Sequence, residues 1–326
     1  MVKDDPLPKR LPRTPALAMT SFFTADPALQ AALDQVIETL RAEFALAPTQ
    51  LAVTWVAYDP PYITNTGGAL SATDFWQYRP RGASYRGVEL IYPASVVKLF
   101  YLVAAHEWLE QGMISPSAEL ERAIKDMIVD SSNDATSLIV DVLSGTTSGP
   151  ELSPGPFATW CHQRNIVNRF FQSLQWPELA GVNMNQKPWG DGPYGRERVF
   201  VGEHYENRNY LTTHAVARLL HSIAGGVAVS AVRSQAMFTL LERTLPSQPP
   251  APGEEDQVTG FLGQGLPPGT RFYSKAGFTS RVRHDAAYFE LPNGVPGLLV
   301  AFTEGQQHSK NQHILPRLAA LVVEHL

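Results

Sequence analysis

The segment from Ser95 to about Gln111 constrains the fold most, because its spacing is helical and it is apolar on nearly every side. A helix without a polar face must be covered by other elements, so we expect it in the middle of a domain. The chain has 326 residues, of which 44% are hydrophobic, and can build a sizeable core around such a helix. The length indicates one large domain or two interleaved ones.

The patterns before and after this helix predict different kinds of structure. Asp26-Pro27 predicts a helix start, because a capping carboxylate precedes a proline at the first helical position. Strands are expected over 51–58 and near 87–91. Helical patterns then cover 117–129, 133–143, 156–174, 213–224 and 230–243. The chain closes with strands over 271–275, 283–291 and 297–303, a hairpin turn at 292–294, and a helix over 308–326.

This order predicts an α+β fold, an α/β sandwich. One antiparallel sheet would be flanked by the N- and C-terminal helices, with an all-helical region inserted between its strands. We expect a disordered or extended arm over residues 1–25 and a single domain over 26–326. Within the domain, the α/β part would span 26–92 and 270–326, and the helical part 93–269. The loop-like stretch over 176–210 is long enough to suggest a function.

The composition limits the classes of binding partner and cofactor that we expect. Charged residues make up 17% of the chain and the net charge is −5, which argues against nucleic acid or an anionic membrane. A single cysteine, Cys161, excludes an intrachain disulfide and a zinc site built on cysteines. We expect no metal or other cofactor, no membrane span and a monomer that takes a small-molecule or peptide substrate. The sequence as written shows no signal peptide and predicts a cytoplasmic protein, or a periplasmic or secreted one if a leader has been removed.

The first chemical motif is Ser95-x-x-Lys98. A serine and a lysine three positions apart on a helix share one face, with Cβ atoms about 5–6 Å apart. A serine hydroxyl needs an adjacent base, and a desolvated lysine can serve as one because desolvation lowers its pKa. Pro93 suits a sharp entry to the helix, which would put Ser95 near backbone N–H groups that can bind an oxyanion. The alternative is an ordinary helix start with a serine cap.

Two further motifs follow in the chain. Ser131-Ser132-Asn133 lies between two expected helices, where by itself it would be a turn and a helix cap. Lys275-Ala276-Gly277 lies at the end of an expected strand. The combination of the three motifs, in this order and in these contexts, is hard to attribute to chance.

From about residue 50 to its end, the chain resembles the class A β-lactamases and related penicillin-recognising serine hydrolases. The stretch from Lys275 to Gly294 is similar to the lysine strand of that family and the hairpin after it. The stretch from Leu211 to Leu220 is similar to the helix that follows its Ω-loop.

The resemblance implies a role for each matching residue. Ser95 would attack the carbonyl of a β-lactam or acylated peptide, and Lys98 would take its proton. Ser131 would pass a proton to the leaving nitrogen, and Asn133 would orient the amide of the substrate side chain. Lys275 would supply positive charge.

Other roles concern the strand after this lysine. The oxyanion hole would consist of the backbone N–H groups of Ser95 and Phe278, beside Gly277. Arg283 is our candidate for a substrate carboxylate, with Arg281 and His284 as alternatives; strand alternation allows only some of them to face the cleft.

The sequence departs from the family at two functional positions. Ala276 stands where the family usually has a hydroxyl that binds the substrate carboxylate, and a missing hydrogen bond to a charged group costs about 1.5–3 kcal/mol. The glutamate that activates the deacylating water has no clear motif. Glu203 is our candidate for it, with Glu197 and Glu206 as rivals.

These observations leave three functions open. The first is a serine hydrolase of β-lactamase type that works through an acyl-enzyme. The second is a penicillin-binding peptidase or esterase with slow deacylation, which Ala276 and the missing glutamate motif favour. The third is a non-catalytic descendant that binds a peptide or glycan, against which the retention of the Ser, Lys and Asn residues argues.

Overall fold

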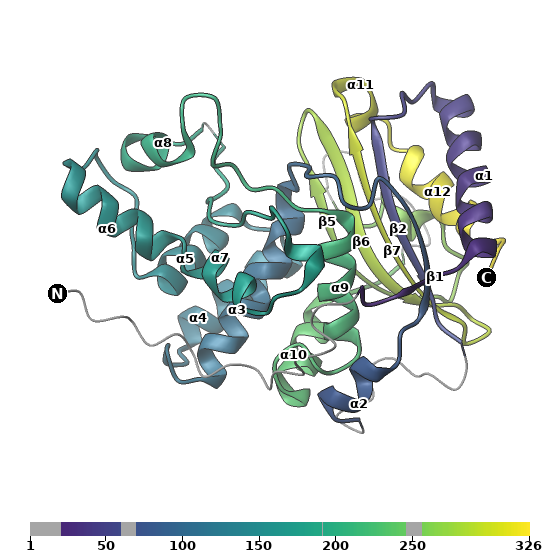
Figure 1. Cartoon of the computed structure of the whole chain (residues 1–326), viewed down its shortest axis with the longest axis horizontal. Helices are drawn as coiled ribbons and strands as arrows, with labels where there is room; N and C mark the ends of the chain where they lie inside the picture. Colours follow the sequence, from purple (N-terminus) through teal and green to yellow (C-terminus); the bar gives the residue numbers. More distant parts are fainter. Residues whose placement is uncertain (1–20, 60–69, 191, 246–255) are drawn as a thin grey trace.

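The computed structural model describes residues 21–59, 70–190, 192–245 and 256–326, and it confirms the expected α+β fold. A seven-stranded sheet lies beside a helical part that is inserted between its strands (Figure 1). The strand order is β1-β3-β2-β7-β6-β5-β4. All neighbouring strands are antiparallel except the short edge pair β1 and β3, which is parallel.

The strands come from the two ends of the described chain and from one short piece of the inserted part. They are β1 (Thr24–Ala25), β2 (Leu51–Ala57), β3 (Arg81–Tyr85), β4 (Glu242–Arg243), β5 (Arg271–Phe278), β6 (Val282–Glu290) and β7 (Pro296–Glu304). The turn between β6 and β7 has the expected form, because Gly294 takes a positive φ of 84° and donates its N–H to Leu291 O at 2.8 Å.

Helices cover both faces of the sheet. On one face, α1 (Pro27–Phe44) and α12 (Ile314–Val323) lie side by side (Figure 1). The Asp26 carboxylate caps α1 as expected, accepting the N–H groups of Ala28 and Leu29. Two short helices, α2 (Ala72–Gln77) and α11 (Gln306–Ser309), also belong to the α/β part.

The helical part contains the remaining elements. These are η1 (Ala94–Val97), α3 (Lys98–Glu110), α4 (Ala118–Val129), α5 (Asn133–Ser144), α6 (Pro154–Arg164), α7 (Ile166–Ser173), η2 (Pro177–Leu179), α8 (Gly195–Val201), α9 (Thr213–Ala224), α10 (Ala231–Leu241) and η3 (Leu262–Gly265).

Helix α3 is the centre of this part. Every side chain from Lys98 to Trp108 is buried, as the uniformly apolar pattern predicts. It contacts α4, α5, α7, α9 and α10. The start of α3 is therefore packed on all sides, and its first residue is Lys98.

Alternation along the strands separates two hydrophobic cores. Val53, Trp55 and Phe289 face α1 and α12. Tyr288 and Phe302 face α9 and the buried helix α3. Because side chains alternate, each strand residue packs in one core, and the inserted helices α3, α9 and α10 pack in the second core.

Several expected elements differ in their limits. The second strand lies at Arg81–Tyr85 rather than near 87–91, where Ile91 makes a single bridge with Leu211. The helix over 156–174 is two helices that meet at Asn165, and the last helix is divided between α11 and α12. Most of the expected arm, residues 1–20, lies outside the described residues. The rest of it is packed, since Phe22 and Phe23 are buried and Thr24–Ala25 pairs with β3.

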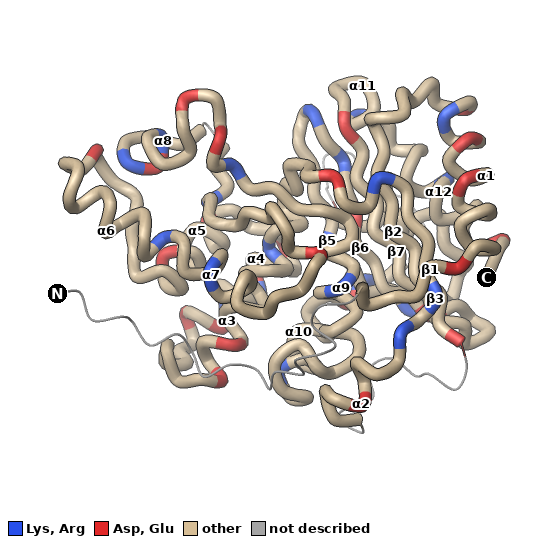
Figure 2. Tube along the Cα trace, in the orientation of Figure 1, with Lys and Arg blue, Asp and Glu red and all other residues tan. Residues whose placement is uncertain are grey.

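Acidic and basic residues are scattered over both parts of the molecule (Figure 2). Within the described ranges, no helix has both the length and the apolarity needed to cross a bilayer.

Candidate active site

The Ser95 segment lies against the end of strands β5 and β6. Ser95 is the third residue of the sequence Pro93-Ala94-Ser95, in the short helix η1 that leads directly into α3. Ala94 takes a left-handed φ of 46°, a strained conformation for a residue with a Cβ. The turn therefore has a specific shape that the surrounding packing must hold.

Two residues of the sheet hold this turn. A Cβ on Gly277 would lie 2.8 Å from Pro93 O and 3.0 Å from Ser95 N, so only glycine permits this approach. His284 lies opposite Gly277 in the β5–β6 register and is fully buried. Its Nδ1 accepts the N–H of Thr303, so its Nε2–H donates to Tyr92 O at 2.9 Å. Burial lowers the pKa of His284 to about 4, which keeps the ring neutral at pH 7.

Lys98 is the most unusual residue at the site, because its side chain is fully buried and has no carboxylate partner among the described residues. Its Nζ donates to Ser131 O at 2.5 Å, to Ser131 Oγ at 3.2 Å and to Asn133 Oδ1 at 2.9 Å. Desolvation lowers the pKa of Lys98 to about 7. The amine can therefore accept a proton near neutral pH.

The Ser131-Ser132-Asn133 motif divides into two roles. Ser132 is the N-cap of α5, because its Oγ accepts the N–H of Ala135. Ser131 takes a left-handed φ of 54° and directs its Oγ between two lysines, whereas Asn133 contacts Lys98. The expectation of a turn and cap thus holds for Ser132 alone.

Lys275 approaches Ser131 from the sheet. Its Nζ donates to Ser131 Oγ at 3.0 Å, to Ala276 O at 2.9 Å and to the side-chain oxygen of Gln257. Burial lowers the pKa of Lys275 well below its usual value, and the charges of Lys98 and Arg243 lower it further. Ser131 Oγ therefore accepts hydrogen bonds from two desolvated amines, those of Lys98 and Lys275.

Gln257 completes this arrangement and was missed from the sequence. Its Nε2 donates to Ile128 O and Val129 O at the end of α4, while its oxygen accepts from Lys275. It lies in the Pro/Gly/acidic stretch over 246–269, where no motif distinguishes it.

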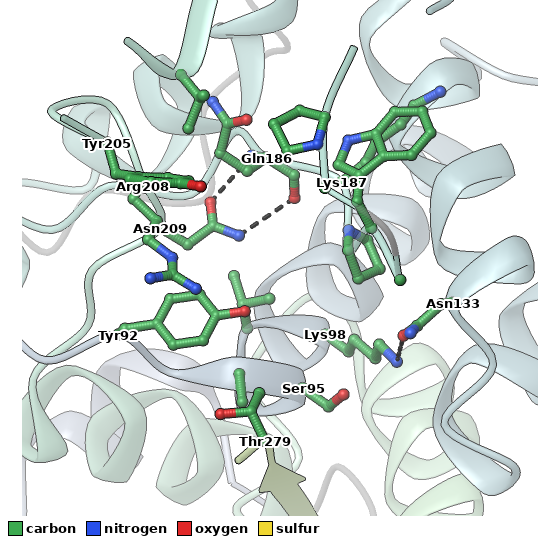
Figure 3. Close-up of a pocket in the computed structure, with 18 of the residues that line it drawn as sticks. Tyr92, Ser95, Lys98, Asn133, Gln186, Lys187, Tyr205, Arg208, Asn209 and Thr279 are labelled. Carbon is green, nitrogen blue, oxygen red and sulfur yellow. Dashed lines mark hydrogen bonds between the residues drawn. The ribbon is translucent and has the colours of Figure 1, made fainter. Parts of the chain in front are cut away.

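A cavity of about 310 Å³ opens at Ser95, and Figure 3 shows the serine hydroxyl and the Lys98 amine on the same side of it. Asn133, Phe278 and Thr279 also line the cavity. The serine–lysine motif predicts that Lys98 Nζ and Ser131 Oγ contact Ser95 Oγ, and this prediction is not met. Within the described residues Ser95 Oγ makes no hydrogen bond, because Lys98 Nζ donates to Ser131 and Asn133 instead.

The opposite wall comes from the long stretch over 176–210. Gln186, Lys187 and Asn209 line the cavity from this side (Figure 3). Asn209 Oδ1 accepts the N–H groups of Asn185 and Gln186, each at 2.9 Å, and Tyr101 OH of α3 donates to Gln186 O at 2.8 Å. The wall is thus fixed by side-chain amides, which no simple sequence pattern indicates.

The structure does not bring the expected glutamate to this cavity. Glu203 is exposed in the turn after α8 and does not line the cavity. Glu206 is also exposed, and its carboxylate accepts the N–H of His204 at 3.1 Å. Glu197 is fully buried, where it accepts hydrogen bonds from Arg164 at 2.7 Å and Ser148 at 2.8 Å. Among the described residues, no Asp or Glu lines the cavity.

Arg283 also lies away from the cavity. Strand alternation puts its side chain on the α1 and α12 face, where its Nε donates to Ser309 O at 2.8 Å and its guanidinium stacks on Phe261. Ala276 is buried on the same face. Arg281 is exposed and does not line the cavity. In the described residues, no cluster of three or more His, Cys, Asp or Glu could hold a metal ion.

The sheet, the inserted helices and the serine–lysine cavity define a protein of the β-lactamase/transpeptidase type. The model of the β-lactamase enzyme family matches residues 70–326, and the chain belongs to this family. No curated protein matches the sequence.

Solved structures share the fold at low sequence identity. A β-lactamase from Sphaerobacter thermophilus is 18% identical, with a TM-score of 0.59 over 90% of this chain and 97% of that one. PBP-A is 16% identical, with a TM-score of 0.59 over 93% and 97% of the two chains. A class A β-lactamase from Bacteroides cellulosilyticus is 15% identical, with a TM-score of 0.59 over 90% and 97%.

The site makes one direct prediction about Lys98. In ¹³C-lysine NMR of the folded protein, the Lys98 signal should titrate near pH 7, because burial without a counter-ion favours the neutral amine. The amine should be charged below this pH and neutral above it. The signal is assigned by its loss in Lys98→Met, with the exposed Lys125 as the internal control. Titration of Lys98 near the usual value of about 10.5 would contradict the prediction.

Proposed function

We propose that the protein is a serine hydrolase that forms an acyl-enzyme on Ser95 with β-lactams or related amides and esters. Membership of the β-lactamase enzyme family supports a hydrolase. The observation that carries the proposal is the buried Lys98, whose amine lies one helical turn from Ser95 and has its pKa lowered to about 7. A buried lysine without a carboxylate would be costly in a protein that did not use it.

The proposed acylation follows from these positions. Lys98 Nζ takes the proton of Ser95 Oγ as this oxygen attacks the substrate carbonyl. The N–H groups of Ser95 and Phe278 stabilise the oxyanion, since both residues line the cavity beside Gly277. When the C–N or C–O bond breaks, Ser131 Oγ gives its proton to the leaving atom. It regains a proton from Lys98, which donates to it at 3.2 Å, while Lys275 contacts the same oxygen.

Asn133 would serve this reaction in two ways. It accepts from Lys98 and lines the cavity, so it can both orient the amine and contact the substrate. Lys275 supports the proton transfer through Ser131, because its Nζ donates to Ser131 Oγ at 3.0 Å. We assign no substrate contact to Arg283, because its guanidinium is engaged with backbone carbonyls on the opposite face.

A second candidate is a penicillin-binding peptidase or esterase whose acyl-enzyme is released slowly. The observation that favours it is the absence of any Asp or Glu among the described residues of the cavity wall. Water that attacks an acyl-enzyme needs a general base, and Glu203 is exposed and does not line the cavity. A variant of the structural neighbour PBP-A has been solved as an acyl-enzyme complex with penicillin G.

One experiment tests both candidates. The protein is mixed with a chromogenic cephalosporin, and colour and intact mass are followed together. We expect a burst close to one equivalent, a persistent covalent adduct and slow turnover afterwards. Ser95→Ala should abolish the adduct, because it removes the attacking oxygen. The exposed Ser117→Ala, outside the cavity, should leave the adduct unchanged.

The outcomes separate the candidates. Rapid sustained turnover would contradict slow release and favour a β-lactamase. A complete lack of adduct and turnover at every concentration would contradict both candidates for β-lactams, and an adduct retained in Ser95→Ala would place the nucleophile elsewhere.

The contact between Gly277 and the Ser95 turn makes a further prediction. Gly277→Ala should fold but should acylate roughly 10-fold to 100-fold more slowly, because the added Cβ displaces the turn that carries the nucleophile. Gly155→Ala is the matched control, since a Cβ there meets nothing within 4 Å. Acylation rates are measured by intact mass with the same cephalosporin. An unchanged rate in Gly277→Ala would contradict the proposed geometry.

A further inference from the structure

Arg208 is a cation on the wall of the cavity that the proposed acylation does not use. Its guanidinium carbon lies 3.5 Å from the ring centroid of Tyr92 and 5.4 Å from that of Tyr205. All three residues line the same cavity as Ser95 (Figure 3). The side chain is half-buried, and its guanidinium makes no hydrogen bond or ion pair with any described residue.

The other cations of the cavity wall are already engaged. Lys187 donates to Asp141 at 2.6 Å and to Ser148 at 2.9 Å, so a carboxylate neutralises it. Lys98 has its pKa lowered to about 7 and is partly neutral at this pH. Among the described residues that line the cavity, Arg208 is thus the one permanent cation without a counter-ion, and no lining carboxylate opposes it.

The local structure fixes Arg208 in place. Asn183 Nδ2 donates to Arg208 O at 2.7 Å, and the N–H of Arg208 donates to Tyr205 O at 3.1 Å. On the other side, His284 holds the backbone carbonyl of Tyr92. A guanidinium stacked on a ring keeps the N–H groups of its edge available, and their fork matches the two oxygens of a carboxylate.

The position of Arg208 indicates which part of a substrate it meets. In the proposed reaction Ser131 protonates the leaving atom, so the leaving group occupies the end of the cavity near Ser131 and Lys98. Figure 3 shows Arg208 and Tyr92 across the cavity from the Lys98 amine, which contacts Ser131. The acyl portion of a substrate bound at Ser95 would extend toward this side.

We propose that Arg208 is a specificity-determining residue that binds a carboxylate on the acyl portion of the substrate. The inference rests on the proposed acylation at Ser95 for its choice of substrate portion. The substrate class is therefore acyl donors with an acidic side chain. The carboxylate of that side chain would form two hydrogen bonds with the Arg208 guanidinium, which stacks on the Tyr92 ring.

A matched pair of penicillins tests this inference. Carbenicillin differs from benzylpenicillin by one carboxylate on the acyl side chain. The second-order rate constant of acylation is measured by intact mass for both compounds. Arg208→Gln should lower the rate constant for carbenicillin about tenfold, the effect of losing a charge-assisted hydrogen bond, and that for benzylpenicillin less than about twofold. Arg208→Lys should retain part of the preference, and the exposed Arg122→Gln on α4 should change neither rate.

Equilibrium binding separates this inference from the proposed acylation. Calorimetry with Ser95→Ala, which needs no chemistry, should show about tenfold tighter binding of carbenicillin, and the double variant with Arg208→Gln should lose this preference. If the wild type is never acylated but Ser95→Ala shows the preference, the acylation proposal fails and the inference stands. Equal effects of Arg208→Gln on both penicillins, no effect, or no binding of either would overturn the inference.

Discussion

The site depends on the burial of the Lys98 ammonium at the start of a helix that is covered on all sides. Helix α3 must lie in the core because it has no polar face, so its first residue enters the core with it. No described carboxylate compensates the charge, and desolvation therefore lowers the pKa of Lys98 to about 7. The same packing that stabilises the fold thus produces an amine that can act as a base.

Three segments that are distant in sequence supply the rest of the site around this amine. The inserted helices bring Ser131 and Asn133 to Lys98, and strand β5 brings Lys275 to the same serine oxygen. Strands β5 and β6 hold the Ser95 turn through Gly277 and His284. Insertion of a helical part between the strands of one sheet is therefore what creates the cavity, since the cavity lies where the two parts meet.

The placement of Ser95 and Lys98 could be predicted from the sequence because local patterns determine it. Ser95 and Lys98 share a helix, and the hydrophobic periodicity correctly located that helix and most others. The cavity wall formed by the stretch over 176–210 could not be predicted in this way. Its position depends on hydrogen bonds between side-chain amides and the backbone, such as that of Asn209 with Asn185, and Glu203 is exposed outside the cavity. The prediction for Arg283 was wrong for a simpler reason. Strand register decides which face of the sheet its side chain occupies, and a shift of one residue moves the side chain to the other face.

The central claim is that neutral Lys98 is the base that activates Ser95. The most direct test is the pH dependence of the second-order rate constant for acylation, measured with one penicillin between pH 5 and 10. The account predicts a rate that rises about tenfold per pH unit below pH 7 and levels off above about pH 7, where the amine is neutral. A rate that is independent of pH through this range, or that rises only near the usual lysine pKa of about 10.5, would contradict the account.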